Sequence, residues 1–121
     1  MGYVKVKARV SNPARNKSID IELIADTGAI YTAIPANLLQ EQLGIAPTGK
    51  RKFKLASGEV KDYPVSEAYI EIEGEGEGVT SLVAFIPKGS TPLLGVTTLE
   101  LLGLQVDPIA GELKPIELLL L

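Results

Sequence analysis

Residues 23–34 read Leu-Ile-Ala-Asp-Thr-Gly-Ala-Ile-Tyr-Thr-Ala-Ile. In this segment one acidic residue, Asp26, stands between two apolar, β-prone runs. A carboxylate in such surroundings is costly to bury unless neighbouring donors satisfy it or it keeps its proton. Thr27 offers a hydroxyl, and Gly28 permits a turn tight enough for backbone N–H groups to face the carboxylate. The pattern predicts a strand, an Asp-Thr-Gly loop and a second strand, with the reactive edge of Asp26 exposed.

The same tripeptide also suits an ordinary hairpin turn, in which the aspartate accepts local backbone hydrogen bonds. Such turns are usually bounded by polar residues, whereas both flanks of Asp26 are apolar. The flanks favour a functional carboxylate, and the rest of the chain has to decide between the two interpretations.

The composition limits the chemistry available to the chain. Its 121 residues are 45% hydrophobic, which suits a single folded domain spanning residues 1–121. The chain has no cysteine and no histidine, which excludes disulfides, a thiol nucleophile, an imidazole base and metal sites built on either side chain. Acid–base chemistry must therefore come from carboxylates, lysines or tyrosines, and we expect no metal and no cofactor.

Charge and the two ends of the sequence bear on partners and location. The net charge of −3 argues against a nucleic-acid partner. The first seven residues alternate apolar and charged side chains, unlike a signal peptide, and the apolar residues 118–121 are too few to span a bilayer. We expect a soluble, cytoplasmic protein that binds neither nucleic acid nor membrane.

Alternation of apolar and polar residues predicts short strands along most of the chain. The predicted strands are residues 3–10, 19–25, 29–34, 50–55, 60–73, 80–87 and 116–121, with a further hairpin at 106–113. The first two should pair as a hairpin. A short helix is predicted at 37–43 with Gly44 as its left-handed cap, and another after Gly95 with Leu99, Leu102 and Leu104 on one face. These elements indicate an all-β, barrel-like domain and exclude a nucleotide-binding α/β fold.

Two charged clusters have simple structural explanations. The run Glu73–Gly78 lacks the ligand spacing of a calcium loop and is better explained as a solvated hairpin end. The cations Lys50, Arg51, Lys52 and Lys54 suit protection of an edge strand better than a phosphate site.

Pro64, within a predicted strand, indicates a bulge or an unpaired edge.

The order of these features resembles the retropepsin-like aspartic proteases, the single-domain family that includes the retroviral enzymes. The matching pieces are the strand into Asp26-Thr27-Gly28-Ala29, the strand with Thr32, the hairpin Ala56-Ser57-Gly58-Glu59, and Leu93-Leu94-Gly95 before a helix. The helix between residues 36 and 43 is more similar to cellular and prokaryotic members than to the viral ones. The resemblance implies an acid-protease barrel with two short helices that acts as a C2 homodimer.

The resemblance also implies roles for individual residues. Asp26 is the catalytic carboxylate, Thr27 supports the loop and reaches toward the partner's loop, and Gly28 supplies the turn. Ala29 and the flap tip contact the bound peptide; the flap tip comprises Ala56, Ser57, Gly58 and Glu59. A plain hairpin is the alternative for these last four residues.

One position departs from the family pattern. Val96 follows Gly95, where viral members usually carry an arginine. The salt link that this arginine makes must therefore be absent or replaced, while Leu93-Leu94-Gly95 is still expected to pack beneath the catalytic loop.

A single aspartate cannot hydrolyse a peptide bond alone, because the reaction needs a base to take a proton from water and an acid to protonate the carbonyl oxygen. Two carboxyl groups about 3 Å apart can do both, since ionising the second beside the first costs about 5 kcal/mol at an effective dielectric constant near 20. One proton is then shared by the pair. Aspartic proteases are the general example of such a pair, so this magnitude is not specific to the present chain.

The second carboxylate has no source within this sequence. Of its four aspartates only Asp26 lies in an Asp-Thr-Gly setting. Asp20 alternates outward, Asp107 precedes a proline in a turn, and Asp62 lies just past the predicted hairpin. The chemistry therefore requires Asp26 of a second molecule, which a two-fold axis would place face to face with the first.

The leading hypothesis is a homodimeric aspartic endopeptidase, a hydrolase that cuts extended segments of peptide or unfolded protein. Its flaps would pair with the substrate backbone and exclude water on closing. The alternative is a non-proteolytic dimeric peptide-binding module on the same fold. A third interpretation is a monomeric barrel with a ligand inside, which is disfavoured because small barrels are usually filled by side chains.

Overall fold

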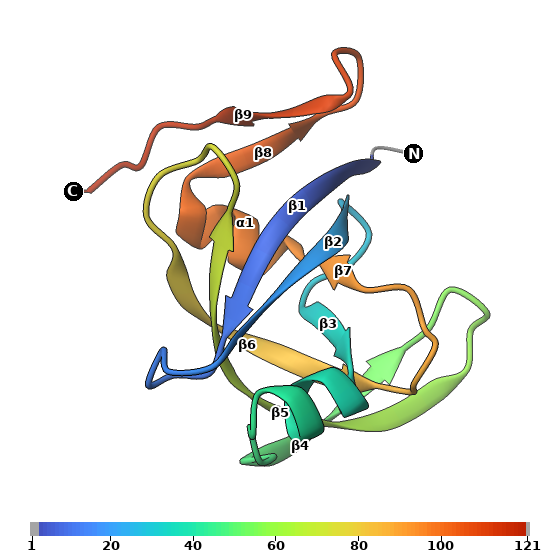
Figure 1. Cartoon of the computed structure of the whole chain (residues 1–121). Helices are drawn as coiled ribbons and strands as arrows, with labels where there is room; N and C mark the ends of the chain where they lie inside the picture. Colours follow the sequence, from blue (N-terminus) through green and yellow to red (C-terminus); the bar gives the residue numbers. More distant parts are fainter. Residues whose placement is uncertain (1–2, 121) are drawn as a thin grey trace.

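The computed structural model of the chain describes residues 3–120. Within this range it contains nine strands, one α-helix and one short π-helix (Figure 1). In chain order the elements are β1 (Tyr3–Ser11), β2 (Ser18–Asp26), β3 (Thr32–Pro35), η1 (Leu38–Gln42), β4 (Gly49–Lys54), β5 (Val60–Ile72), β6 (Val79–Ile86), β7 (Leu93–Leu94), α1 (Val96–Leu102), β8 (Leu104–Asp107) and β9 (Glu112–Pro115).

Six of the strands close into a barrel. The large sheet has the order β1-β2-β7-β3-β6-β5-β4, and β1 also pairs with β5, Ala8–Ser11 against Tyr69–Ile72. This second pairing closes the ring and leaves β4 outside it as an edge strand. Strands β8 and β9 form a separate hairpin, which in Figure 1 lies at the opposite end of the molecule from β4.

The predicted hairpin of the first two strands is confirmed, and its register fixes the end of β2. The pairing runs from Tyr3 opposite Asp26 to Ser11 opposite Ser18. Leu23 is buried on the inner face. A slip of one residue would turn this apolar face to solvent, so the burial of alternate residues determines where β2 delivers Asp26.

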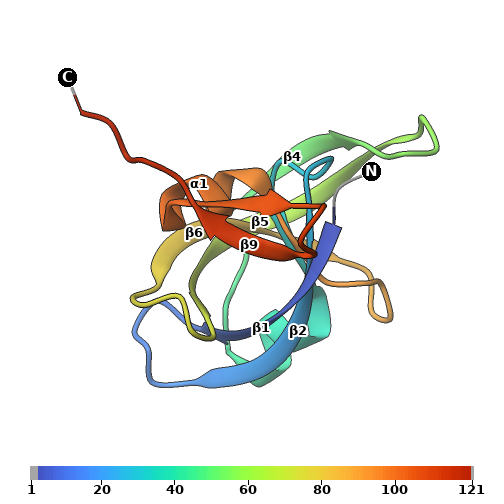
Figure 2. The same cartoon turned by 90° about the horizontal axis from the view of Figure 1, so that it is seen from above.

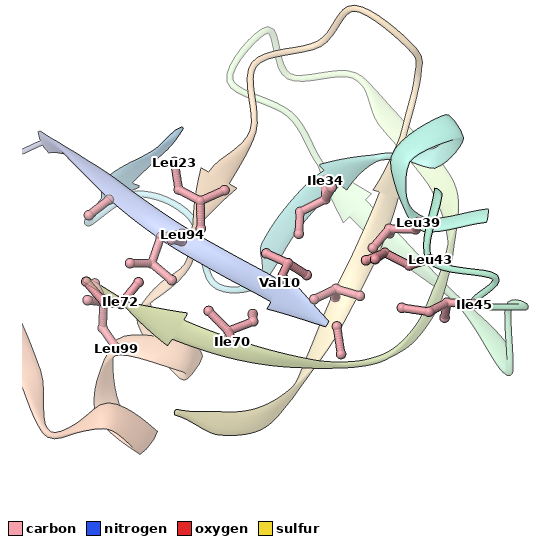
Figure 3. Packing of buried hydrophobic residues seen from close by; sticks show 14 of the residues in the cluster. Val10, Leu23, Ile34, Leu39, Leu43, Ile45, Ile70, Ile72, Leu94 and Leu99 are labelled. Carbon is pink, nitrogen blue, oxygen red and sulfur yellow. The ribbon is translucent and has the colours of Figure 1, made fainter. Parts of the chain in front are cut away.

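Apolar side chains fill the barrel. Figure 3 shows side chains from several strands and both helices directed toward a common interior, among them Val10, Leu23, Ile34, Leu43 and Leu94. Each large side chain removed from water in this way stabilises the fold by about 1.5–3 kcal/mol. The packed interior argues against the interpretation in which a ligand occupies the barrel.

Both predicted helices are present, although the first is wound differently from an α-helix. Residues Leu38–Gln42 form a π-helical turn in which the Leu43 N–H donates to the Leu38 carbonyl at 3.2 Å. Gly44 then adopts the predicted left-handed conformation, with φ of 67°. Helix α1 is seven residues long, and no helix within residues 3–120 has the length and hydropathy needed to cross a membrane.

The strand predicted at residues 29–34 begins only at Thr32. The carbonyls of Ala29 and Ile30 accept the N–H groups of Val96 and Thr97, at 2.8 and 3.0 Å. The backbone before Thr32 is therefore bonded to the first turn of α1 instead of to a neighbouring strand, a long-range pairing that alternation along the sequence cannot indicate.

The prediction of a terminal strand at residues 116–121 is wrong for residues 116–120, and Leu121 lies outside the described residues. The Ile116 N–H donates to the Gly103 carbonyl at 2.8 Å, at the point where α1 gives way to β8. Strand β8 begins at Leu104, which pairs with Pro115 of β9. Beyond Ile116 the chain therefore has no residue of β8 with which to pair. Within this chain residues 116–120 therefore leave the body of the molecule, as Figures 1 and 2 show.

The hairpin of β4 and β5 agrees with the expectations for its charged residues and its proline. Strand β4, with its lysines and arginine, is the edge of the sheet. Pro64 lies opposite Lys50, and β6 pairs with β5 only from Val65 onward. Pro64 thus marks an unpaired edge, the second of the two explanations, and Glu73–Gly78 forms the turn from β5 to β6.

Candidate active site

Asp26 ends β2 and is held by its own loop. Its Oδ1 accepts the Gly28 N–H at 2.8 Å, and its carbonyl accepts the Ala29 N–H at 3.1 Å. A Cβ at position 28 would lie 3.3 Å from Oδ1, which is tight enough to disturb this bond. The Asp26 side chain is half-buried, whereas Thr27 and Gly28 are exposed. The predicted loop, a carboxylate fixed by a backbone donor at a solvent-facing strand end, is present.

Strand β7 pairs with the end of β2. Ile24 and Ala25 pair in parallel with Leu93 and Leu94, and the Ile24 N–H donates to the carbonyl of Pro92 at 3.1 Å. Leu94 is fully buried in the main core. The Leu-Leu-Gly segment therefore lies beside the strand that leads into the Asp-Thr-Gly loop, which agrees with the position that the resemblance implied.

The start of α1 fixes the far side of the loop through the main chain. Besides the bonds from Val96 and Thr97 to the loop carbonyls, Gly95 lies directly against Tyr31: a Cβ on Gly95 would fall 2.3 Å from the Tyr31 carbonyl carbon. Only glycine permits this approach. The link between this segment and the loop is thus made by the Val96 backbone, which needs no arginine side chain.

Three buried hydroxyls join the elements around the loop, and sequence reasoning missed two of them. The Gly95 N–H donates to Thr32 Oγ1 at 3.0 Å, Thr32 Oγ1 lies 2.6 Å from Thr98 Oγ1, and Thr98 Oγ1 lies 2.8 Å from Ser81 Oγ. Ser81 Oγ in turn donates to the Leu82 carbonyl at 3.3 Å. One consistent assignment makes each hydroxyl a donor to the next group, so that none is left unsatisfied. This series of hydrogen-bonded hydroxyl groups joins β3, α1 and β6.

The four predicted flap residues form the turn at the tip of the β4–β5 hairpin. The Leu55 N–H donates to the Glu59 carbonyl at 2.8 Å, and Ser57 Oγ accepts the Glu59 N–H at 3.3 Å. Gly58 has φ of 90° and open space around it, so the turn requires glycine for its backbone alone. All four residues are exposed, and the hairpin projects from the barrel in Figures 1 and 2.

The hairpin meets the segment that follows the Asp-Thr-Gly loop through aromatic residues that the sequence did not single out. The Phe53 ring packs edge-on against Tyr31, with centroids 5.5 Å apart, and lies 6.0 Å from the Tyr63 ring. Tyr31 follows Asp26 by five residues. The hairpin therefore contacts the loop segment through Phe53, which lies in the second pair from the turn. The only signal in the sequence was that Phe53 interrupts a run of cations.

The other three aspartates are engaged elsewhere. Asp20 Oδ1 accepts a hydrogen bond from Arg9 at 2.9 Å, and this bond holds the pKa of the Asp20 carboxyl below its usual value. Asp62 pairs with Lys52 at 3.2 Å, and Asp107 accepts two backbone N–H groups of its own turn. Within the described residues each has a local partner, which agrees with their predicted exclusion from the site.

An apolar groove adjoins the Asp-Thr-Gly loop at Thr27. It has a cavity volume of about 590 Å³ and lies between α1 and the C-terminal segment, with Thr27 in its wall. Its lining also includes Val96, Leu99, Leu104, Val106, Ile116, Leu118, Leu119 and Leu120. Leu119 is 81% exposed and Leu120 98% exposed, so in a single chain this apolar segment faces water beside the loop.

Comparisons with known proteins agree with this architecture. A family model described as aspartyl protease matches residues 6–98, about three quarters of the chain. The solution structure of simian foamy virus (mac) protease is similar, with a TM-score of 0.55 and 19% sequence identity over 81% of this chain and 93% of that chain. None of the curated proteins matches the sequence. The structural likeness establishes a retropepsin-like fold.

Proposed function

Since the chain belongs to the aspartyl protease family, we propose that it is a homodimeric endopeptidase in which two chains each contribute Asp26 to one active site. The observation that carries this proposal is the Asp26 loop itself. Its carboxylate is fixed at the end of β2 by the Gly28 N–H, and the loop behind it is bonded to β7 and α1. Such a rigid setting suits a group that must meet a symmetry-related copy of itself.

The reaction follows from the pair. The ionised carboxylate takes a proton from a water molecule, whose oxygen attacks the peptide carbonyl carbon, while the protonated carboxyl group gives its proton to the carbonyl oxygen. The carboxyl group that took the proton from water then gives it to the nitrogen as the C–N bond breaks, and a hydroxyl of the tetrahedral intermediate returns its proton to the other carboxylate as the new carboxylic acid forms.

The apolar groove supports the proposed dimer. The exposed leucines at 118–120 adjoin Thr27 and helix α1, so a second copy covering them would also face the catalytic loop. An isologous interface of this kind buries the same surface on both chains and brings the two loops together. Neighbouring exposed apolar side chains of this kind suit an interaction surface.

The β4–β5 hairpin supports an extended substrate. Residues 60–64 of β5 pair with β4 alone, so the hairpin has open backbone edges on both sides. An extended peptide can add to such an edge through main-chain hydrogen bonds, which are insensitive to its sequence. Together with the carboxylate pair, this arrangement favours cleavage within a chain over cleavage at its ends.

The direct test is cleavage of an unstructured protein between pH 3 and 7 by the wild-type protein and by Asp26→Asn. We expect activity to fall by about 10²- to 10⁴-fold in the variant, because both carboxyl groups of the acid–base pair, one from each chain, are replaced. Asp20→Asn is the matched control, since it removes an exposed carboxylate of β2 that pairs with Arg9 and lies outside the loop and the β4–β5 hairpin. Circular dichroism verifies that both variants fold.

The outcomes separate the competing functions. Equal cleavage by wild type and Asp26→Asn contradicts the proposal. A peptide that binds the wild-type dimer and is recovered intact by mass spectrometry identifies the non-proteolytic binding module instead.

A further inference from the structure

The β4–β5 hairpin has two chemically different faces. We call residues 49–65 the flap hairpin. Facing positions in an antiparallel pair share a side of the sheet, as do residues two apart. Phe53 contacts Tyr31, and Gly49 faces Val65, which packs against Ala33 in the small core cluster. The side of the flap hairpin that carries Phe53 is therefore turned toward the strand that follows the catalytic loop.

Two cations share this side. Arg51 lies opposite Tyr63, and Lys61 lies opposite Phe53, so these four residues form what we call the inner face. The outer face carries Lys50, Lys52 and Lys54 with Asp62. Lys52 is paired with Asp62 at 3.2 Å, whereas within residues 3–120 no carboxylate lies within ion-pair distance of Arg51 or Lys61. Both inner cations are exposed.

The charge of the flap hairpin opposes that of the rest of the chain. It holds five cations and two carboxylates, a net charge of +3, whereas the remaining residues hold seven cations and thirteen carboxylates, a net charge of −6. An acidic segment is therefore repelled by the body and attracted to the flap hairpin. Protection of the edge accounts for the three outer lysines, but it gives no reason for two unpaired cations on the aromatic side.

We infer that the inner face selects extended peptides that carry aspartate or glutamate close to the bond that is cut, with Arg51 and Lys61 as the specificity-determining residues. The inference rests on the proposed endopeptidase function and names its substrate class. Aromatic side chains would hold the apolar part of the segment, while the two cations pair with its carboxylates. Exposed ion pairs are weak singly, so each cation should favour an acidic over a neutral residue by about 2- to 5-fold.

The test uses three peptides that differ at one position beside the cleaved bond: glutamate, glutamine or lysine. At pH 6 the glutamate is ionised, because its ordinary pKa is about 4.3. We expect kcat/KM for the wild type to rank glutamate above glutamine above lysine. Arg51→Gln and Lys61→Gln should each reduce the preference, whereas Lys50→Gln and Lys54→Gln, which remove the same charge from the outer face, should preserve it. At pH 3.5, where the glutamate is largely protonated, the preference should shrink.

A second measurement separates this inference from the proposed function. Fluorescence anisotropy gives the affinities of the same labelled peptides for Asp26→Asn, which needs no catalysis. Equal affinity for the glutamate and glutamine peptides overturns the inference even if both are cleaved by the wild type. Tighter binding of the glutamate peptide with no cleavage by the wild type supports the inference about acidic peptides and contradicts the proposed peptidase activity. If the inner variants weaken only the dimer, the cations serve the subunit interface and the inference is wrong.

Discussion

The Thr32 and Thr98 hydroxyl oxygens lie 2.6 Å apart in the interior, although the residues are separated by 66 positions in the sequence. This contact joins β3, the strand after the Asp-Thr-Gly loop, to helix α1. The same helix begins with Val96 and Thr97, whose N–H groups bind the carbonyls after the loop. The position of the loop therefore depends on how α1 packs against β3.

Replacing Thr98 with valine should therefore destabilise the protein. The side-chain shape is kept, but the Thr32 and Ser81 hydroxyls lose a buried partner, and we expect a loss of about 1–3 kcal/mol in the free energy of unfolding. Urea denaturation at neutral pH measures it. Thr97→Val, at the neighbouring and less buried position, should change the free energy by less than about 0.5 kcal/mol; equal losses in the two variants would contradict the role given to Thr98.

Gly95→Ala should lower the free energy of unfolding more than an alanine does at a glycine with a left-handed backbone and open space around it. The new Cβ would meet the Tyr31 backbone at 2.3 Å, so the loop or α1 must move, and we expect a loss of about 3 kcal/mol or more. Gly76, with φ of 77° and open space around it, is the control: Gly76→Ala should cost about 1 kcal/mol for its left-handed backbone. Thermal unfolding of the two variants compares them, and a smaller loss at Gly95 would show that the contact relaxes readily.

Phe53→Ala should uncouple the flap hairpin from the loop segment. The variant loses the edge-on contact with Tyr31 and about half of a buried ring, which predicts a loss of about 1–2 kcal/mol. Because the hairpin is proposed to hold substrate, KM for peptide cleavage should rise several-fold while kcat changes less. Lys54→Ala, on the adjacent residue and the opposite face, serves as the control. An unchanged KM in Phe53→Ala would argue that Phe53 has only a packing role.

The Arg9–Asp20 pair predicts a small stability contribution that depends on pH. The hydrogen bond from Arg9 lowers the pKa of Asp20 in the folded state, so its contribution is present above the ordinary pKa of an aspartate and is lost as the pH falls through the lowered value. Asp20→Asn should therefore be less stable than wild type at pH 7 and equal to it near pH 2. Urea denaturation at the two pH values, with Glu67→Gln as a surface control, measures the difference; a gap that widens on acidification would reverse the sign.

The apolar C-terminal segment predicts where the dimer can be broken. Leu119→Asp combined with Leu120→Asp places two charges where a second copy is proposed to pack, and sedimentation velocity at micromolar concentration should then show monomers. Activity should fall with the dimer, because each active site needs both chains. Ile109→Asp changes an equally exposed apolar residue at the tip of the β8–β9 hairpin, outside the groove, and should leave the dimer intact. Dimers that persist in the double variant would place the interface elsewhere.

Local patterns were sufficient where a structure depends on neighbours in sequence. Alternation predicted the β1–β2 hairpin, and the Asp-Thr-Gly tripeptide predicted a loop in which a backbone N–H faces the carboxylate. Glycine placement predicted the left-handed residue that ends the first helix. Each depends on backbone geometry and burial within a few residues, which composition and spacing encode directly.

The sequence by itself determined most of the strands, the one Asp-Thr-Gly loop and the order of features that marks an aspartyl protease. Only the tertiary structure decided that Ala29 and Ile30 bond to α1, that Thr98 and Ser81 complete a hydroxyl chain with Thr32, and that Phe53 meets Tyr31. These contacts join residues far apart in the chain, and their partners are chosen by how the barrel closes. For the same reason residues 116–120 form no strand, since a strand exists only where another backbone lies beside it.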